Sequence, residues 1–511
     1  MNRKILYKYL LPVALIAFFM ASCSGESAST AYTNVIPADI PIVLSFDAKA
    51  MLDKAGLGEK ESTAIKQKLV NIIKDEVSAE SFTLFEKIIK NPAESGIDMT
   101  APLYVFFDSI EGTPAIVAKI GNQSKWTALL KTMASEDLVT PAEEHNGYHS
   151  VKLSNSEVTC AFNKTSILII NDNNYFSFFT DSLMLQKEEN SLSASAAFRD
   201  MLKKKGEIKC TAFLKEFPSN TVENGLEDMV IISNLSFENG RISLQAESYM
   251  NNKELKALFE QQRKIFQPQD LAFVSKYPIS TLAYIGLNLN GEKLCNFIRE
   301  NNEIYKPYFP HTWWKPEVWE TVEEFLYCFD GDLSVGLLDT SLSSVSFAAY
   351  AKVKEDAAAK ALYHIADKYG ITNGITQINP DKYVGQFWGD KIYFGLKNKQ
   401  LYVTNDERTA DNITQSLNGK TLQDAKFAPN MKTVSPYAVV SVENILDLPV
   451  MKLFDLKGGG AYSAYMNFVS RISYLEITGD GTAGEVNLCF KDKKTNALKQ
   501  VTDVARQYSG M

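Results

Sequence analysis

The alternation of apolar and polar positions predicts a chain built from both strands and helices. Short apolar runs bounded by turn residues, such as IPIVLSFD and LAYIGLN, are typical of strands. Between such runs lie helical patterns, and the clearest has apolar residues at positions i, i+3, i+4 and i+7: Trp126, Leu129, Leu130 and Met133. The pattern therefore predicts an α+β fold.

Tight turns between the predicted strands indicate how the strands pair. The sequence ENGR at 238–241 separates NLSF from ISLQAE, and GDG at 479–481 precedes EVNLCF. Asparagine and glycine in this arrangement favour two-residue hairpins. Because hairpins join antiparallel neighbours, we expect mainly antiparallel sheets, with the helices packed on one face.

The pattern occurs twice along the chain. LYVFFDSIEGTPAIVAKI matches LSVGLLDTSLSSVSFAAYAKV, and NKTSILIIND matches NKQLYVTND. In the same alignment the strand ending at Asp47 corresponds to the strand ending at Asn288. The repeat predicts two tandem duplicated lobes, a first α+β repeat at 37–266 and a second at 267–511, with a groove between them as a candidate ligand site.

The N-terminal pattern predicts an export signal. Arg3 and Lys4 precede an apolar stretch from Leu10 to Phe19, and Cys23 follows small residues. This arrangement resembles a bacterial lipoprotein signal peptide. The resemblance implies removal of residues 1–22 and lipids on Cys23, with 23–36 forming the lipidated cysteine and a flexible tether. The alternatives are a plain signal peptide or an uncleaved membrane helix, for which the stretch is short.

The expected location and the charge restrict the possible partners. A lipid anchor on Cys23 would hold the protein to a membrane of the cell envelope, and we expect the outer membrane, facing either the periplasm or the cell surface. The whole chain has a formal charge of −8, and loss of the basic residues in 1–22 makes it more negative. This charge argues against nucleic acid as a partner.

Two segments carry a family resemblance. IPADIPIVLSFDAKAML, and NPAESGIDMTAPLYVFF at 91–107, resemble a family of Bacteroidota lipoproteins known as a domain of unknown function. The resemblance implies an extracytoplasmic, lipid-anchored, two-lobed α+β protein. It carries no catalytic residues over to this chain.

The sequence lacks common catalytic and metal-binding motifs. It contains no GxSxG, HExxH or GxxxxGK[ST] pattern. His145 and His149 are four residues apart, beside Glu143 and Glu144, but the Asn-Gly pair between the histidines predicts a turn that separates them. We therefore expect no metal and no cofactor.

The cysteines beyond Cys23 indicate no metal site and no disulfide framework. They are five in number, widely spaced, and include no CxxC pair. Cys160, Cys210 and Cys489 lie in apolar, strand-like runs, so we expect buried reduced thiols.

The segment YKPYFPHTWWKPEVW at 305–319 is unusually aromatic. Its prolines keep the first part out of a regular helix. Aromatic residues held this way can form a stacking surface for sugars or an anchor for a protein partner, whereas the alternative is a small core that pins the segment to its lobe. The residues of this candidate binding surface are Tyr305, Tyr308, Phe309, His311, Trp313, Trp314 and Trp319.

These observations favour a non-catalytic, lipid-anchored envelope protein with a binding or scaffolding role. Its partners would be the membrane, through the anchor, and an unknown envelope protein or glycan. One alternative is a glycan-binding accessory lipoprotein that uses Trp313, Trp314 and Trp319. Another alternative is a hydrolase with a site between the lobes.

Overall fold

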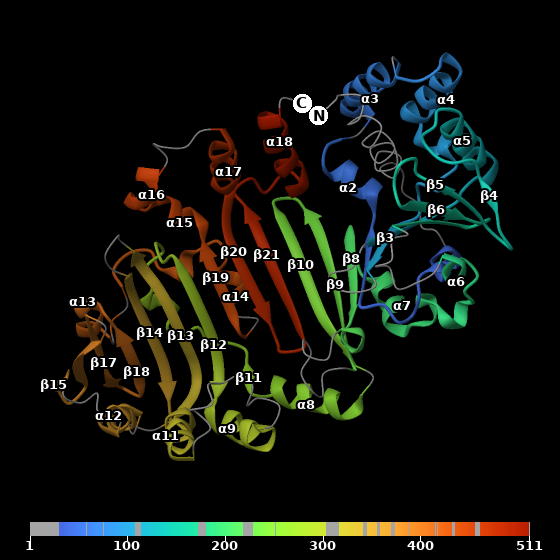
Figure 1. Cartoon of the computed structure of the whole chain (residues 1–511). Helices are drawn as coiled ribbons and strands as arrows, with labels where there is room; N and C mark the ends of the chain where they lie inside the picture. The colour runs from blue at the N-terminus through green and yellow to red at the C-terminus, as the bar shows by residue number, and fades with distance from the viewer. Residues whose placement is uncertain are drawn as a thin grey trace. The chain divides into compact units, whose positions relative to one another are not determined.

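The computed structural model shows an α+β fold with antiparallel strand pairing (Figure 1). It describes residues 30–509 except 58, 75, 108–113, 172–179, 218–227, 251, 303–315, 341–344, 355–357, 369–373, 388, 414, 416, 432–434 and 455–459. The predicted fold class is confirmed. Within the described part, no helix is both long enough and apolar enough to cross a membrane.

Contacts group the chain into two compact units. The first unit extends to residue 250 and also includes Lys493–Arg506, and the second unit comprises Asn252–Asp492 and the residues from Gln507 onward. The helix Lys253–Arg263, which follows the last long strand of the first repeat, therefore belongs to the second unit. Residues 497–506, in the helix that follows the last strand of the second repeat, belong to the first unit. The repeat boundaries inferred from sequence, 37–266 and 267–511, stay a prediction.

The first unit alternates strands with helices and short 3-10 helices, labelled η. Its strands are β1 (Ile42–Phe46), β2 (Leu103–Phe107), β3 (Pro114–Lys119), β4 (Glu143–Glu144), β5 (His149–Lys152), β6 (Val158–Phe162), β7 (Ser166–Asn171), β8 (Ile208–Phe213), β9 (Met229–Glu238) and β10 (Arg241–Met250). Its helices are η1 (Ala31–Val35), α2 (Ala48–Lys54), α3 (Glu59–Lys74), α4 (Ala79–Lys90), η2 (Pro92–Ser95), α5 (Gln123–Ser135), α6 (Thr180–Met184), η3 (Glu188–Asn190), η4 (Leu192–Ala194), α7 (Ala196–Lys203) and η5 (Leu214–Glu216).

The second unit follows the same plan. Its strands are β11 (Phe266–Gln267), β12 (Ala283–Asn290), β13 (Phe329–Thr340), β14 (Val345–Val353), β15 (Ile375–Asn379), β16 (Lys382–Phe387), β17 (Asp390–Lys397), β18 (Gln400–Thr404), β19 (Tyr437–Ser441), β20 (Ile472–Gly479) and β21 (Ala483–Phe490). Its helices are α8 (Lys253–Arg263), η6 (Val274–Lys276), α9 (Gly291–Glu300), α11 (Pro316–Tyr327), α12 (Ala358–Lys368), α13 (Glu407–Asp411), η10 (Leu422–Asp424), α14 (Ala428–Met431), α15 (Val442–Asp447), α16 (Pro449–Phe454) and α17 (Gly460–Ser470).

The described strands of both units have the same order. In the first unit the order is β4-β5-β6-β7-β3-β2-β1-β8-β9-β10. In the second unit it is β15-β16-β17-β18-β14-β13-β12-β19-β20-β21. A strand of one unit can therefore be matched to its counterpart residue by residue.

The register of the sheets reproduces the alignment made from sequence. Phe46 lies opposite Leu103 in the first unit, and Leu287 lies opposite Leu333 in the second. Asp47 and Asn288, which follow Phe46 and Leu287, thus occupy the same position. Asp47 caps α2 by accepting a hydrogen bond from the backbone N–H of Ala50, at 2.9 Å. In the second unit this capping role moves two residues along the chain, to Asn290.

Helices pack on both faces of the sheet in the first unit, so the expectation that they pack on one face is wrong. In β3 of the first unit, Val117 belongs to a core with η1 and α7, whereas its neighbour Ala118 belongs to a core with α3, α4 and α5. Successive side chains of a strand point to opposite faces, so these cores lie on opposite sides. The reason is that α4 and α5 each carry a buried apolar stripe that needs a sheet surface.

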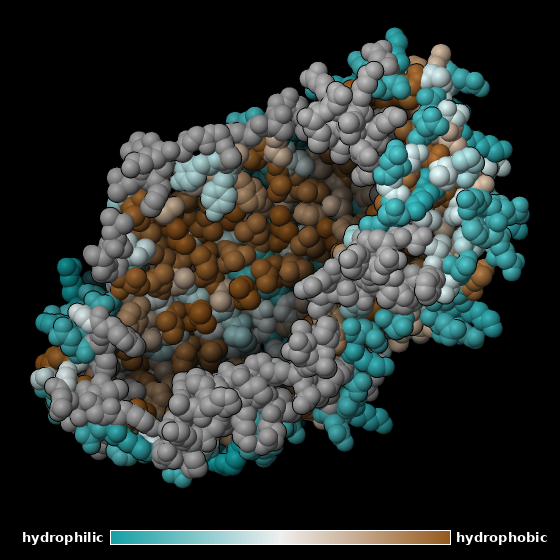
Figure 2. Space-filling model, viewed as in Figure 1, coloured by the Kyte–Doolittle hydropathy of each residue, from teal (hydrophilic) through white to brown (hydrophobic). Residues whose placement is uncertain are grey.

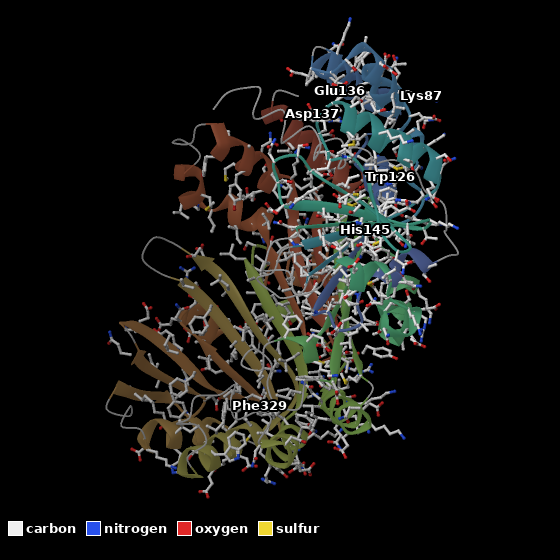
Figure 3. The ribbon with its side chains drawn as sticks, turned by 45° about the vertical axis from the view of Figure 1, so that its right-hand side comes forward. Lys87, Trp126, Glu136, Asp137, His145 and Phe329 are labelled. Atoms are coloured by element: carbon white, nitrogen blue, oxygen red, sulfur yellow. The ribbon has the colours of Figure 1, made fainter. Side chains whose placement is uncertain are left out.

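The predicted helix and hairpins are present. The stripe of α5 is buried as predicted, and Trp126, labelled in Figure 3, meets Phe162 edge to face at 6.2 Å between ring centroids. The turn between β9 and β10 uses Gly240 at φ 68°, a backbone conformation that residues with a Cβ rarely adopt. The turn between β20 and β21 uses Gly481 at φ 90°.

The segment after β21 is bound to strands of the first unit. The backbone N–H of Gly240 donates to the carbonyl of Thr495 at 2.9 Å, and the Asn496 amide donates to the carbonyl of Phe237 at 2.9 Å. The helix that follows, α18 (Ala497–Ser509), places the Thr502 hydroxyl 2.8 Å from the carbonyl of Ala55. Residues 493–506 thus complete the first unit.

Candidate functional site

A continuous apolar row crosses the second unit on one face of its sheet. Each residue of the row lies directly opposite the next one on the neighbouring strand: Val403, Ala349, Val335, Ile285, Ala438, Ile477 and Val486. Directly opposed residues project from the same face. We call these seven residues the central row.

The central row is open to solvent where it crosses β12, β13 and β20. The exposed fractions are 50% for Ile285, 41% for Val335 and 46% for Ile477. The other four side chains of the row are half-buried, and none of the seven belongs to the hydrophobic cores of the described residues. Apolar side chains that share one face of a sheet and are exposed to solvent are typical of a binding site.

Apolar side chains continue on both sides of the central row. Two residues along each strand in one direction lie Ala283, Leu337, Phe347, Val440, Leu475 and Leu488, all half-buried. In the other direction lie Leu287 and Leu333, which pack against the core that contains Phe329. The central row and these flanking residues form what we call the open face, and Figure 2 shows hydrophobic residues gathered over the strands of the second unit.

The opposite face of these strands is a closed core. Tyr284 and Tyr437, which neighbour Ile285 and Ala438 in sequence, are 2% and 0% exposed. They belong to a core rich in tyrosine, in which the ring of Tyr277 meets that of Tyr284 edge to face at 5.2 Å. Burial raises the pKa of the Tyr277 phenol well above its ordinary value, and its hydroxyl is hydrogen-bonded to the Ser334 hydroxyl at 2.9 Å.

A row with the same register exists in the first unit, with different composition. Its residues are Ile169, Ile116, Val105, Leu44, Cys210, Ser233 and Ala246. Ser233 stands where the second unit has Ile477, and Cys210 stands where it has Ala438. The row of the second unit is therefore the more apolar of the two.

The two histidines of the first unit lie on either side of a turn and stack on aromatic rings. Gly147 has φ 90° in the turn between β4 and β5, as the Asn-Gly pair predicted. The ring of His145, labelled in Figure 3, stacks on Tyr148 at 4.5 Å, and His149 stacks on Phe162 at 5.4 Å. Among the described residues no group of three or more His, Cys, Asp or Glu side chains is arranged to hold a metal ion.

One pair in the first unit has the spacing of a nucleophile and a base. His145 Nε2 lies 2.8 Å from the Ser150 hydroxyl. Both residues lie on the β4–β5 hairpin, and in the described part of the chain no carboxylate is hydrogen-bonded to His145 to orient the ring. Catalysis of acyl transfer needs such an orienting group and an oxyanion site, so this bond is explained by the pairing of the two strands.

Two depressions are present elsewhere in the described surface. One, of about 180 Å³ in the first unit, includes Ser195 and Lys215, and the other, of about 310 Å³ in the second unit, includes Lys391 and Asp406. Ser195 caps α7 and Asp406 caps α13, so both polar groups already have structural partners.

The structure describes only some of the other candidate residues. Cys23 lies outside the described residues, as do Tyr305, Tyr308, Phe309, His311, Trp313 and Trp314. Trp319 is half-buried in α11, a helix that contacts α9 and α12. The described cysteines form no disulfide, and burial raises the pKa of the Cys160 thiol to about 12.

Comparison with known proteins gives a family without an assigned activity. The model of a domain of unknown function, DUF4836, matches residues 32–498, and the chain belongs to this family. No curated protein matches the chain. A solved structure titled "Structure of crystal form I of TP0453" is similar over 48% of this chain and 89% of its own, at 11% identity and a TM-score of 0.26, which is too low to carry an argument.

Proposed function

We propose that the protein is a non-catalytic, lipid-anchored cell-envelope protein that binds another envelope component through the open face of the second unit. The observation that carries the proposal is the exposure of Ile285, Val335 and Ile477 in one row on one face of the sheet. Exposed apolar patches of this kind are costly in water and are typical of binding surfaces.

The proposed lipid anchor and the proposed cellular location are inferred from the N-terminal sequence. The charged, apolar and small-residue stretches that end at Cys23 support lipidation of this cysteine in a bacterium of the Bacteroidota. The anchor would place the protein at the outer membrane, on the periplasmic or the outer side. A Cys23→Ser variant should lose incorporation of labelled palmitate and leave the membrane fraction, and retention of both by the variant would refute the anchor.

We also propose that the chain consists of two lobes that arose by duplication. The identical strand order of the two units supports an origin by duplication of one α+β repeat. The polar residues Ser233 and Ser248, which stand in the first unit where the second has Ile477 and Leu488, support a division of roles in which the second unit carries the binding surface.

The experiment that tests the binding role is photo-crosslinking in intact envelopes. A photoreactive phenylalanine analogue at Val335 should form an adduct, because this side chain belongs to the central row and is 41% exposed. The matched control is Ile378 in β15, which is 49% exposed and lies outside the open face. No adduct at Val335, or the same adduct at both positions, would refute the binding role.

The aromatic segment enters the same experiment as a comparison. The double variant Trp313→Ala/Trp314→Ala should leave the Val335 adduct unchanged. Loss of the adduct in this variant would favour the alternative in which Trp313, Trp314 and Trp319 form the binding surface.

A further inference from the structure

We infer that the open face of the second unit binds the hydrocarbon chains of a lipid. This inference rests on the proposed function and names the chemistry of its ligand. It depends on three features of the face: the kind of side chains, their area, and the difference between the two units.

The first feature is that the central row is purely aliphatic. It contains Val, Ala and Ile and neither a charged nor an aromatic residue. Protein interfaces usually depend on Trp, Tyr and Arg anchors that combine apolar area with a polar group. A surface without such anchors offers only non-directional contact, and a hydrocarbon chain requires nothing more.

The backbone under the row is unavailable for hydrogen bonding to a ligand. Strands β12, β13 and β14 each have a neighbour on both sides, and the N–H and C=O groups of β12 pair with β13 on one side and β19 on the other. A peptide that bound by strand addition would need a free edge. An extended peptide lying flat on this face would have to leave polar backbone groups unsatisfied, whereas a hydrocarbon has none.

The second feature is the size of the open face. Neighbouring strands lie about 4.8 Å apart, so the seven residues of the central row span about 29 Å. Two flanking rows at about 3.4 Å per residue give a width of about 14 Å and an area on the order of 400 Å². A stable protein interface buries about 800 Å² on each partner, which disfavours a second copy of this chain as the ligand. One leaflet of a bilayer core is about 15 Å deep, so an extended acyl chain fits within the row.

Helices lie along one border of the open face. Leu287 and Leu333 pack against the core formed with Phe297 of α9 and Phe329. In this region α11 contacts both α9 and α12, which lie side by side with it in Figure 1. A chain that lies along the central row therefore has apolar side chains beneath it and helices along one side.

The third feature is that only the second unit keeps the row apolar. Ser233 replaces the isoleucine found at 477, and Ser248 replaces the leucine found at 488. A hydroxyl facing a hydrocarbon loses hydrogen bonds to water without gaining a partner. The second unit should therefore bind hydrocarbon more tightly than the first.

A titration with cis-parinaric acid, a fatty acid that fluoresces when bound in an apolar site, tests the inference. The protein is the full chain carrying Cys23→Ser, so that its own lipid cannot compete. We expect saturable binding, and binding weakened roughly ten-fold or more by Ile285→Thr/Val335→Thr/Ile477→Thr, which removes apolar contact but keeps β-branched residues in the strands. The controls Ile378→Thr and Leu44→Thr/Val105→Thr should each change the affinity less than about three-fold.

The outcomes separate this inference from the proposed function. If the chain shows no saturable binding, or if the triple variant binds as tightly as the parent chain, the lipid assignment is wrong. An adduct between Val335 and a protein in the crosslinking experiment would then leave the binding role standing. Ten-fold weakening by the first-unit variant would refute the assignment to the second unit. If the triple variant does not fold, as judged by circular dichroism, Ile285→Thr alone should still weaken binding about three-fold, and its failure to do so would overturn the inference.

Discussion

Glu476 occupies in the second unit the position that Ile232 occupies in the first. Glu476 precedes Ile477 of the central row, and Ile232 precedes Ser233, the equivalent residue of the first unit, so both project from the opposite face of their sheet. Both are almost fully buried, at 2% and 1% exposure. The Glu476 carboxyl accepts hydrogen bonds from the Asn430 amide at 3.0 Å, the Tyr437 hydroxyl at 3.1 Å and the Asn487 amide at 3.2 Å. Equivalent positions of the two units thus differ: one contributes to aliphatic packing and the other to a buried polar network.

Replacing Glu476 with Ile, the residue of the first unit, should destabilise the protein. The substitution leaves the donors of Tyr437 and Asn487, both buried, without their acceptor, and each such group costs about 1–3 kcal/mol. Denaturant titration should show a clear fall in the unfolding midpoint. The control is Glu157→Ile at an ion pair whose glutamate is 65% exposed, where a change within about 0.5 kcal/mol is expected. Equal midpoints for both variants would contradict the role of the network.

The ion pair between Asp98 and Lys119 should make the first unit sensitive to acid. Partial burial alone would raise the pKa of Asp98, but hydrogen bonds from Thr100 and the Lys119 ammonium at 2.9 Å hold that pKa below its usual value. A lowered pKa contributes stability above the unfolded pKa, near 4, and the contribution is lost as pH falls through the folded pKa. Asp98→Asn should lower the free energy of unfolding by about 1 kcal/mol at pH 7, but not near pH 2, as measured by denaturant titration.

A matched control separates this effect from general acid denaturation. Asp53 pairs with Lys49 at 2.9 Å on the surface, where its side chain is 54% exposed, so Asp53→Asn should change little at either pH. A deficit in Asp98→Asn that persists unchanged at pH 2 would show that the charge is not its cause.

The buried thiols should be unreactive in the folded protein. Burial raises the pKa of Cys160 to about 12, and the thiolate is the reactive form. Iodoacetamide at pH 8, followed by peptide mass spectrometry, should leave Cys160 unlabelled until guanidinium unfolds the chain. Cys328, which is half-buried, is the internal comparison. Rapid labelling of Cys160 in the native protein would contradict its burial.

The segment after β21 should stabilise strands that lie far away in sequence. Truncation after residue 492 removes the bonds from Asn496 to Phe237 and from Gly240 to Thr495. Hydrogen exchange in β9 and β10 should therefore become faster. A truncation after Arg506 keeps these bonds and serves as the control. Unchanged exchange in the first variant would refute the assignment of 493–506 to the first unit.

Local features of the fold could be predicted from the sequence because they depend on nearby residues. The stripe of Trp126, Leu129, Leu130 and Met133 fixes the buried side of α5 whatever covers it. The glycines at 240 and 481 fix the hairpins through backbone conformation. The pairing of Asp47 with Asn288 follows from two repeats of one pattern.

The open face could not be predicted, since it has no distinctive sequence pattern. Alternation reveals an exposed face only when that face is polar. In β12 the outward Ile285 and Leu287 are as apolar as the inward Tyr284, so the strand reads as buried on both sides. The covering of both faces by helices was missed for a related reason. A helical stripe shows that a helix needs a partner surface, but it does not show which side of the sheet provides it.

Native mass spectrometry of the Cys23→Ser chain, purified without detergent from the soluble fraction of the cells that produce it, tests the central claim most directly. The claim is that the open face around Ile285, Val335 and Ile477 is the binding surface of the protein. We predict a bound component of lipid mass on the parent chain and on Ile378→Thr, and its loss from Ile285→Thr/Val335→Thr/Ile477→Thr. A parent chain with no added mass, or a triple variant that retains the same added mass, would contradict the claim.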